Sequence, residues 1–254
     1  RLVLPWLRLS VYAARSLAVV EVRRDPRSAS SGDEEVCRFC GSTLTAANRP
    51  PGPPVAPAVA NVCTQEYCQD RSREVSLDIL PCGHASCGCR EEGEWGEEWK
   101  LPCLLGCDDP RLQGHDLCPI CFTDELSQAP CIRLRCGHVV HRACMRDVVR
   151  IRWPSVHMSW KFLDCPVCSA NPVAHPSLDD ILEPLTALRE EHAKKALLRL
   201  QYEDLDKHED IVTPGAKFFN DPQGYALDTY AYAQCHKCSK PFFLGRKDCM
   251  VAGV

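Results

Sequence analysis

Four pairs of cysteine and histidine residues between residues 118 and 168 constrain this chain more than any other feature of its sequence. In chain order they are Cys118 and Cys121, Cys136 and His138, His141 and Cys144, and Cys165 and Cys168. Thiolate and imidazole groups at such short spacings are typical zinc ligands, and eight of them suffice for two tetrahedral ions. A segment of this length has little hydrophobic core, so bound zinc would supply much of its folding free energy.

The order of the pairs predicts that they interleave. A CxH pair in second place, followed by HxxC, is typical of a cross-brace RING-H2 domain, here over residues 117–169. The first and third pairs would hold one zinc ion, and the second and fourth pairs the other. Two independent fingers, or accidental pairs, are the alternatives, and neither requires this order. RING domains bind ubiquitin-conjugating enzymes (E2 enzymes), so the pattern predicts a RING-type E3 ubiquitin ligase that acts on a protein substrate.

Three apolar residues match the shallow groove in which RING domains resemble one another and receive the E2. Ile120 lies inside the first CxxC pair, Pro166 inside the last, and Trp153 follows the expected central helix. Exposed apolar anchors of this kind serve recognition, although Trp153 could instead be a core residue. Ser169 stands where many RING domains that activate ubiquitin directly have a cationic residue, and serine cannot act as a long cationic clamp. This departure predicts that ubiquitin passes to something other than a substrate lysine.

The 19 cysteines indicate either a disulfide scaffold or a set of metal sites. The opening residues 2–22 are fairly apolar, but Arg8 and Arg15 interrupt them, which leaves no signal peptide or membrane span. Without a route to an oxidising compartment we expect metal sites, in a cytoplasmic or nuclear protein with no membrane partner.

The net charge of −4 gives no general attraction to nucleic acid. A local basic run is predicted to be the solvated face of a helix beside a metal site, and it consists of Arg142, Arg146, Arg150 and Arg152. We therefore expect no nucleic-acid partner, and a zinc-rich nucleic-acid-binding protein remains the disfavoured alternative.

The upstream residues 36–108 hold nine further cysteines and are predicted to form a stabilising zinc module. Cys37, Cys40, Cys63 and Cys68 could close one site across a proline-rich bridge at residues 49–57. A second site has more candidate ligands than one ion needs, and we favour Cys82, Cys87, Cys103 and Cys107, with His84 as the substitute. Residues 1–35 are expected to be disordered or foreign to the natural protein.

Residues 176–210 are predicted to form a linker helix, since leucine and alanine recur there at helical spacing. Ser177 is the expected N-cap, and Pro184 should kink or restart the helix. Turn signals and an aromatic segment then lead to another CxxC pair, Cys235 and Cys238. The predicted fold class is small zinc-stabilised α+β. It combines the RING, the linker helix, the upstream zinc module and an incomplete tandem-cysteine domain at 211–254.

From residue 118 onward the sequence resembles the C-terminal part of the Pam/Highwire family, the Myc-binding-protein-type RING-Cys-relay E3 ligases. The matching stretches are CPICFT at 118–123, DDILEP at 179–184, KALLRL at 195–200, TPGAKF at 213–218, NDPQGYA at 220–226 and YAY at 230–232. A looser resemblance continues upstream, through NRPP at 48–51, LPCGH at 80–84 and LPCLLGC at 101–107.

This resemblance implies a relay in which ubiquitin passes from the E2 to one cysteine, then to a second cysteine, and finally to a threonine hydroxyl. Cys249 matches the upstream relay cysteine, and zinc ligation is implied for Cys235 and Cys238. The neighbours Arg246 and Lys247 favour the thiolate that the reaction needs, whereas Asp248 opposes it. An unpaired zinc ligand or an inert thiol is the alternative for Cys249, in which case the chain would be a RING adaptor that only recruits the E2.

The chain begins with Arg1 rather than Met and ends at Val254. We therefore expect a fragment, truncated within the tandem-cysteine domain. The family's second relay cysteine, its helper histidine and the ligands that complete the zinc site of Cys235 and Cys238 would lie beyond this end. We expect such a fragment to accept ubiquitin without completing its transfer to threonine.

Overall fold

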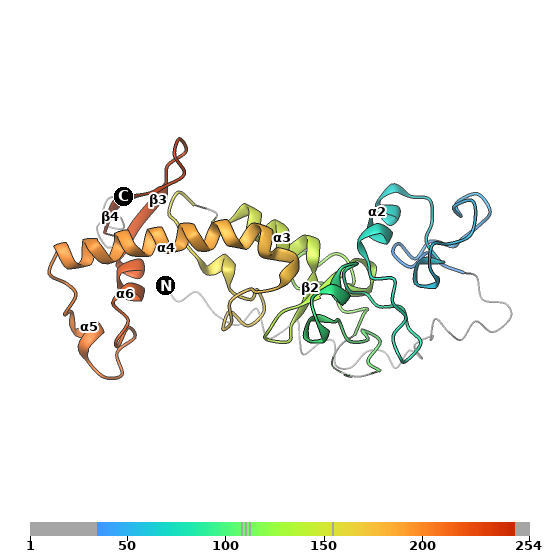
Figure 1. Cartoon of the computed structure of the whole chain (residues 1–254), viewed down its shortest axis with the longest axis horizontal. Coiled ribbons are helices and arrows are strands. Elements are labelled where there is room, and N and C mark those ends of the chain that lie inside the picture. The colour runs from blue at the N-terminus through green and yellow to red at the C-terminus, as the bar shows by residue number, and fades with distance from the viewer. Residues whose placement is uncertain (1–34, 108, 110, 112, 154, 247–254) are drawn as a thin grey trace, which may run out of the picture. The chain divides into compact units, whose positions relative to one another are not determined.

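A computed structural model of the chain describes residues 35–107, 109, 111, 113–153 and 155–246 (Figure 1). The predicted N-terminal segment 1–35 therefore lies outside the described residues, apart from Glu35. The same is true of Cys249, since residues 247–254 are not described.

The described residues form short helices and two small antiparallel sheets. The α-helices are α2 (Glu66–Glu74), α3 (Arg142–Ile151), α4 (Asp179–Tyr202), α5 (Glu209–Val212) and α6 (Pro222–Thr229). Short 3-10 turns are η1 (Pro57–Val59), η2 (Glu92–Glu94), η3 (Glu97–Trp99), η4 (Leu126–Gln128), η5 (Lys161–Leu163) and η6 (Pro176–Leu178). One sheet pairs β1 (Cys131–Arg133) with β2 (Val139–His141), and the other pairs β3 (Tyr230–Gln234) with β4 (Pro241–Arg246). This small α+β content agrees with the predicted fold class.

One hydrophobic core joins the upstream zinc region to the segment that carries the four Cys/His pairs. Leu101 and Leu104 from upstream pack with Ile132 and Met145 from β1 and α3. Residues of η6 and α4 complete the same cluster. Because the cluster contains side chains from both regions, each region helps to bury the other, and loss of one should lower the stability of the other.

Polar contacts reinforce this joint core. The Arg71 guanidinium of α2 donates to the Asp124 carboxylate at 2.6 Å and to the Gln128 carbonyl at 2.8 Å. The Cys131 amide of β1 donates to the Cys87 carbonyl at 2.8 Å. Cys131 itself is buried, and its thiol donates to the Leu126 carbonyl at 3.0 Å.

The basic run on and after α3 is largely paired rather than solvated. Arg146, whose side chain is only 15% exposed, donates both terminal nitrogens to the Asp180 carboxylate, at 2.8 and 2.5 Å. Arg152 donates to Gln234 Oε1 at 3.0 Å. These contacts join α3 to the start of α4 and to β3, so the predicted solvated face is wrong for these two residues.

Helix α4 begins and continues differently from the prediction. Its N-cap position is Leu178, without a side-chain cap, because the 3-10 turn η6 occupies the three preceding residues. Ser177 lies in that turn, and its hydroxyl is 2.8 Å from His175 Nδ1. The helix runs through Pro184 without a restart. Proline lies close to the helix start, where its missing N–H removes one hydrogen bond and leaves the later turns intact.

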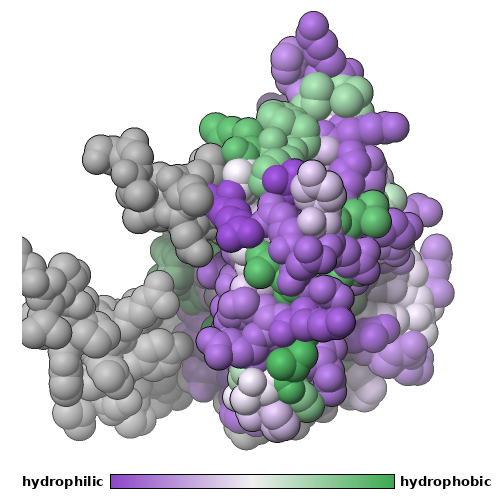
Figure 2. Space-filling model, turned by 90° about the vertical axis from the view of Figure 1, so that its left-hand side faces the viewer, coloured by the Kyte–Doolittle hydropathy of each residue, from purple (hydrophilic) through white to green (hydrophobic). Residues whose placement is uncertain are grey.

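The second half of α4 packs against α5, α6 and the β3–β4 hairpin in a separate core. Its buried residues are Met158, Ala196, Leu200, Ile211, Ala226, Tyr230 and Tyr232. Figure 2 shows apolar side chains gathered beneath the hydrophilic tip on this side of the molecule. Among the described residues, none of the helices has both the length and the apolar character that a membrane span requires.

Candidate metal centres and the cysteine hairpin

The structure gathers the eight Cys/His residues of 118–168 into two interleaved groups. Cys118, Cys121, His141 and Cys144 form one group, and Cys136, His138, Cys165 and Cys168 form the other. Within each group all ligand atoms lie within 4.8 Å of one another. The sequence predicted these groupings from the order of the pairs.

The measured separations suit a tetrahedral zinc ion. Two sulfurs on one such ion are about 3.8 Å apart, and a sulfur and a nitrogen about 3.6 Å. His141 Nδ1 lies 3.8 Å from the sulfur of Cys121 and 3.7 Å from that of Cys144. His138 Nδ1 lies 3.3 Å from the Cys136 sulfur and 3.6 Å from the Cys165 sulfur. Both groups therefore have a donor set and a spacing that fit zinc.

His141 is oriented for metal binding by the backbone. Its Nε2 lies 3.0 Å from the Glu125 carbonyl, which accepts a hydrogen bond from the Nε2–H tautomer. That tautomer leaves the lone pair of Nδ1 directed toward the three thiols. The residue is 2% exposed, at the junction of β2 and α3, so its ring position is set by packing as well as by this bond.

The CxxC pairs share one backbone turn. In the pairs that begin at Cys118 and Cys165, the carbonyl of the first cysteine accepts the amide of the residue after the second, at 3.0 and 2.8 Å. That following residue is Phe122 or Ser169, with φ of 56° and 53°. The turn directs both sulfurs and nearby amides toward one point, which is what a metal half-site needs.

Backbone amides aimed at the thiols lower some of their pKa values. The amide of Ala170 lowers the pKa of Cys168 to about 6. Burial raises the pKa of Cys121, but hydrogen bonds from Asp124 and Thr123 outweigh it and lower the value to about 6. Burial dominates at Cys144 and raises its pKa to about 12. Metal binding at this group must therefore displace a proton from at least the Cys144 thiol.

The first upstream group contains the four predicted cysteines. Cys37, Cys40, Cys63 and Cys68 lie together, with 3.8 Å between the sulfurs of Cys37 and Cys68 and 3.7 Å between those of Cys40 and Cys63. Helix α2 supplies Cys68, and a small core with Phe39 surrounds the group. These distances again match a tetrahedral site.

The second upstream group differs from the favoured prediction. It consists of Cys82, His84, Cys103 and Cys107, so His84 takes the place that was predicted for Cys87. His84 Nδ1 lies 3.5 Å from the Cys103 sulfur and 3.4 Å from the Cys107 sulfur. The Cys87 sulfur instead lies 3.6 Å from an Arg38 guanidinium nitrogen. A positive φ at Gly83 allows the tight turn that brings the sulfur of Cys82 and the ring of His84 to one side.

The three residues predicted to bind the E2 differ in environment. Pro166 is exposed, and Ile120 is partly buried against the main core. Trp153 is also partly buried, and its ring lies 5.6 Å from the Trp160 ring in an edge-on contact. Trp153 therefore packs as a core residue would on one side while keeping some exposed surface.

The β3–β4 hairpin carries Cys235 and Cys238 in the same turn as the other CxxC pairs. The Ser239 amide donates to the Cys235 carbonyl at 2.8 Å, and Ser239 has φ of 58°. Amides of Cys238 and Lys237 lower the pKa of Cys235. Among the described residues, no further ligand joins these two cysteines to make a group of three or more. The hairpin thus presents a metal half-site.

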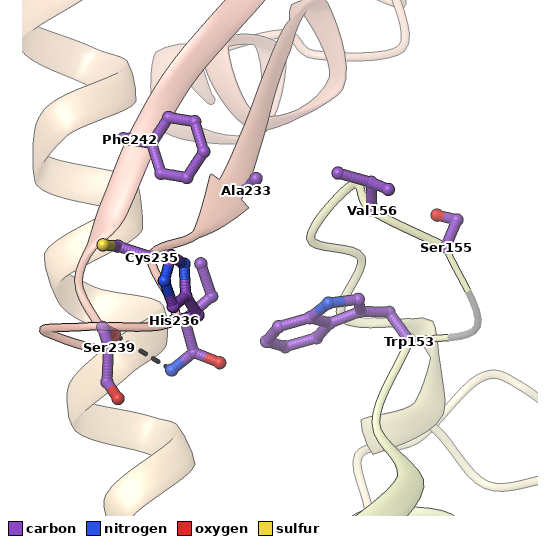
Figure 3. A pocket seen from close by; sticks show the side chains of 9 residues that line it. Trp153, Ser155, Val156, Ala233, Cys235, His236, Ser239 and Phe242 are labelled. Atoms are coloured by element: carbon purple, nitrogen blue, oxygen red, sulfur yellow. Dashed lines mark hydrogen bonds between the residues drawn. The ribbon is translucent and has the colours of Figure 1, made fainter.

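A cavity of about 710 Å³ separates this hairpin from the chain after α3 (Figure 3). Trp153 and Val156 line one wall, and Cys235, His236 and Phe242 line the other. The indole of Trp153 points across the cavity toward His236. The sequence did not predict that these two segments, which are far apart in the chain, face each other.

Comparison with known proteins relates most of the chain to E3 ubiquitin-protein ligases, whereas no protein-family model matches it. It is 39% identical over 248 residues to "E3 ubiquitin-protein ligase MYCBP2" of Danio rerio. It is 37% identical over 261 residues to "E3 ubiquitin-protein ligase highwire" of Drosophila melanogaster. Both matches cover 96% of this chain and 5% of the relative. The chain therefore spans about one-twentieth of the length of these relatives, and the resemblance predicted from its sequence is confirmed.

Proposed function

Because the chain is homologous to one segment of the Pam/Highwire E3 ubiquitin-protein ligases, we propose that it is the E2-binding, ubiquitin-accepting part of a RING-type E3. The observation that carries this proposal is the pair of interleaved Cys/His groups at 118–168. Zinc, when bound there, supplies folding free energy and rigidity rather than chemistry. E2 and ubiquitin are the proposed partners, together with a protein substrate, in the reducing cytoplasm or nucleus.

We propose that the E2 docks on the two loops held by the interleaved groups. The exposed Pro166 and the half-buried Ile120 and Trp153 would form its apolar contact. Apolar anchors of this type concentrate binding free energy in a few residues. Ser169 cannot hold the ubiquitin of a charged E2 by a long cationic side chain. Ser169 has φ of 53° in this turn, and the residue is exposed.

The proposed reaction is transthioesterification to Cys249. The Cys249 thiolate would attack the thioester carbonyl that links ubiquitin to the E2 cysteine. A new thioester forms at Cys249, and the E2 thiolate leaves. In the family that the sequence resembles, ubiquitin then passes through a second cysteine to a threonine hydroxyl, which gives an ester. We propose the same end product for the full ligase to which this segment belongs.

A RING adaptor that recruits the E2 without accepting ubiquitin is the second candidate. The half-buried packing of Trp153 does not separate the two, since both require the docking surface. They differ at Cys249 alone.

Calorimetric titration of an E2 into the zinc-loaded chain tests the docking surface. Ile120→Ala and Pro166→Ala should each weaken binding by about tenfold, the usual cost of removing an interface anchor. Pro172→Ala is the matched control, because Pro172 is also an exposed proline after the last pair but lies outside the proposed contact. Equal affinities for all three variants would refute this surface.

A further inference from the structure

The chain between Cys144 and Cys165 contacts the C-terminal hairpin directly. The Met158 amide donates to the Tyr232 carbonyl of β3 at 2.8 Å. The Met158 side chain is 5% exposed and belongs to the same core as Tyr230 and Tyr232. A segment of the predicted RING therefore hydrogen-bonds to the strand that leads to Cys235.

His192 on α4 contacts both the 155–160 segment and the C-terminal hairpin. Trp160 Nε1–H donates to His192 Nδ1 at 3.0 Å. The centre of the imidazole ring lies 4.7 Å from that of the Tyr232 ring. His192 is 1% exposed. One buried side chain thus joins the 155–160 segment, the linker helix and the hairpin.

The polar contact distinguishes His192 from an ordinary core residue. A buried indole N–H without an acceptor loses the hydrogen bonds that it would make to water. His192 supplies that acceptor to Trp160, which fixes the indole, and Trp160 in turn lies against Trp153. The orientation of the 155–160 segment on α4 therefore depends on the Nδ1 acceptor as well as on apolar burial.

The hairpin also directly precedes the proposed ubiquitin acceptor, Cys249, in the sequence. Strand β4 ends at Arg246, three residues before Cys249. Glu203, the C-cap residue of α4, accepts a hydrogen bond from Arg246 Nε at 2.8 Å, which holds that end of the strand. Any movement of the hairpin relative to the E2-binding loops would therefore move Arg246, three residues before Cys249 in the sequence.

We propose that His192 is a positioning residue that holds the Cys235–Cys238 hairpin at a fixed place relative to the E2-binding loops. This inference rests on the proposed function for its consequence, namely that ubiquitin is delivered to Cys249 from a fixed direction. A displacement of about 1 Å between reacting groups can lower a rate by about a hundredfold. The contact is therefore expected to affect the rate of transfer more than the binding of the E2.

Two substitutions at His192 separate positioning from packing. His192→Leu keeps apolar bulk but removes the acceptor. His192→Asn loses bulk but keeps an oxygen close to the position of Nδ1. Trp160→Phe removes the donor from the other side. Leu104→Ala is the control for general destabilisation, because Leu104 is 3% exposed in the main core and is not part of this contact.

The first measurement is hydrogen exchange at the Met158 amide in the zinc-loaded 254-residue chain. We expect exchange to be about tenfold faster in His192→Leu and Trp160→Phe, the effect of one lost buried hydrogen bond. His192→Asn should stay within about threefold of the unaltered chain. The double variant His192→Leu/Trp160→Phe should exchange no faster than either of these single variants, since each of them removes the same Trp160–His192 hydrogen bond.

The second measurement is single-turnover formation of the Cys249 thioester from a ubiquitin-loaded E2. The maximal rate should fall about tenfold in His192→Leu, while the half-saturating E2 concentration and the zinc content stay unchanged. His192→Asn should recover most of the rate. If His192→Leu equals or exceeds His192→Asn in both measurements, or if Leu104→Ala reproduces its effects, the proposal is overturned.

The two measurements also separate this proposal from the proposed function. If the unaltered chain forms no thioester, the relay fails, and the exchange data alone decide the role of His192. Faster Met158 exchange in His192→Leu than in His192→Asn would then still support positioning. Equal exchange in these two variants would overturn it.

Discussion

Replacing Cys118 by serine should remove two zinc ions rather than one. Cys118 is fully buried in the main core, and its group alternates along the chain with the group of Cys136 and Cys165. Residues 136 and 138 lie between the two halves of the Cys118 group. Release of the first ion therefore frees the backbone that aligns the ligands of the second.

The magnitudes favour loss of the whole region. A structural zinc ion contributes about 10–16 kcal/mol of apparent binding free energy. A domain of this size is stable by only about 5–15 kcal/mol in total. The apolar cluster around Met145 and Ile132 cannot replace such a contribution, so the 118–168 segment should unfold in Cys118→Ser.

Metal analysis of the purified variants measures this effect. The four groups among the described residues predict four zinc ions bound by them in the unaltered chain and about two in Cys118→Ser. Cys131→Ser is the matched control, because Cys131 is 1% exposed in the same core and belongs to no group among the described residues. It should keep four ions and lose about 1–2 kcal/mol of stability. Loss of a single ion from Cys118→Ser, with the Cys136 group intact, would refute the interleaved arrangement.

Three further predictions concern pH and packing. Zinc affinity should fall as pH decreases from 8 to 6, since the proton that burial retains on Cys144, with its pKa raised to about 12, must leave when the metal binds; a competition titration at several pH values measures this. Burial raises the pKa of Glu203, but hydrogen bonds from Arg246 and other donors outweigh it, so the folded-state pKa is lowered. The stability that the Glu203 carboxylate contributes is therefore present above the unfolded-state pKa and is lost as pH falls through the folded-state pKa. Glu203→Gln should lower the free energy of unfolding by about 1–2 kcal/mol at pH 7 and by much less at low pH, as measured by denaturant unfolding. Arg71→Ala should lower the free energy of unfolding by about 1 kcal/mol, with no loss of zinc, because it removes the contacts with Asp124 and Gln128 but no ligand; an unchanged midpoint would contradict the joint core.

The groups at 118–168 could be predicted because the order of their ligand pairs along the chain is typical of one arrangement, the cross-brace. Each pair is local, and the order of pairs determines how two ions can share them. At 82–107 the same reasoning had more ligands than it needed, and nothing local separated His84 from Cys87. In the structure the Cys87 sulfur lies beside Arg38, which is more than 40 residues away in the chain and could not be paired with it from the sequence.

Contacts between distant segments were not predictable from local pattern. Trp160 and His192 are 32 residues apart, and neither belongs to a motif. Leucine spacing predicted the linker helix, but it gave no indication of which helix face would receive the hairpin. Likewise, Ser177 resembled an N-cap, whereas the 3-10 turn before α4 places it one position earlier than the observed cap at Leu178.

The most direct test of the central claim is to mix a ubiquitin-loaded E2 with the zinc-loaded chain and look for a covalent adduct. We predict an adduct that reducing agent cleaves, that is absent in Cys249→Ser and that persists in Cys131→Ser. No adduct in a folded, zinc-loaded chain, or an adduct that survives in Cys249→Ser, would contradict the claim that Cys249 accepts ubiquitin.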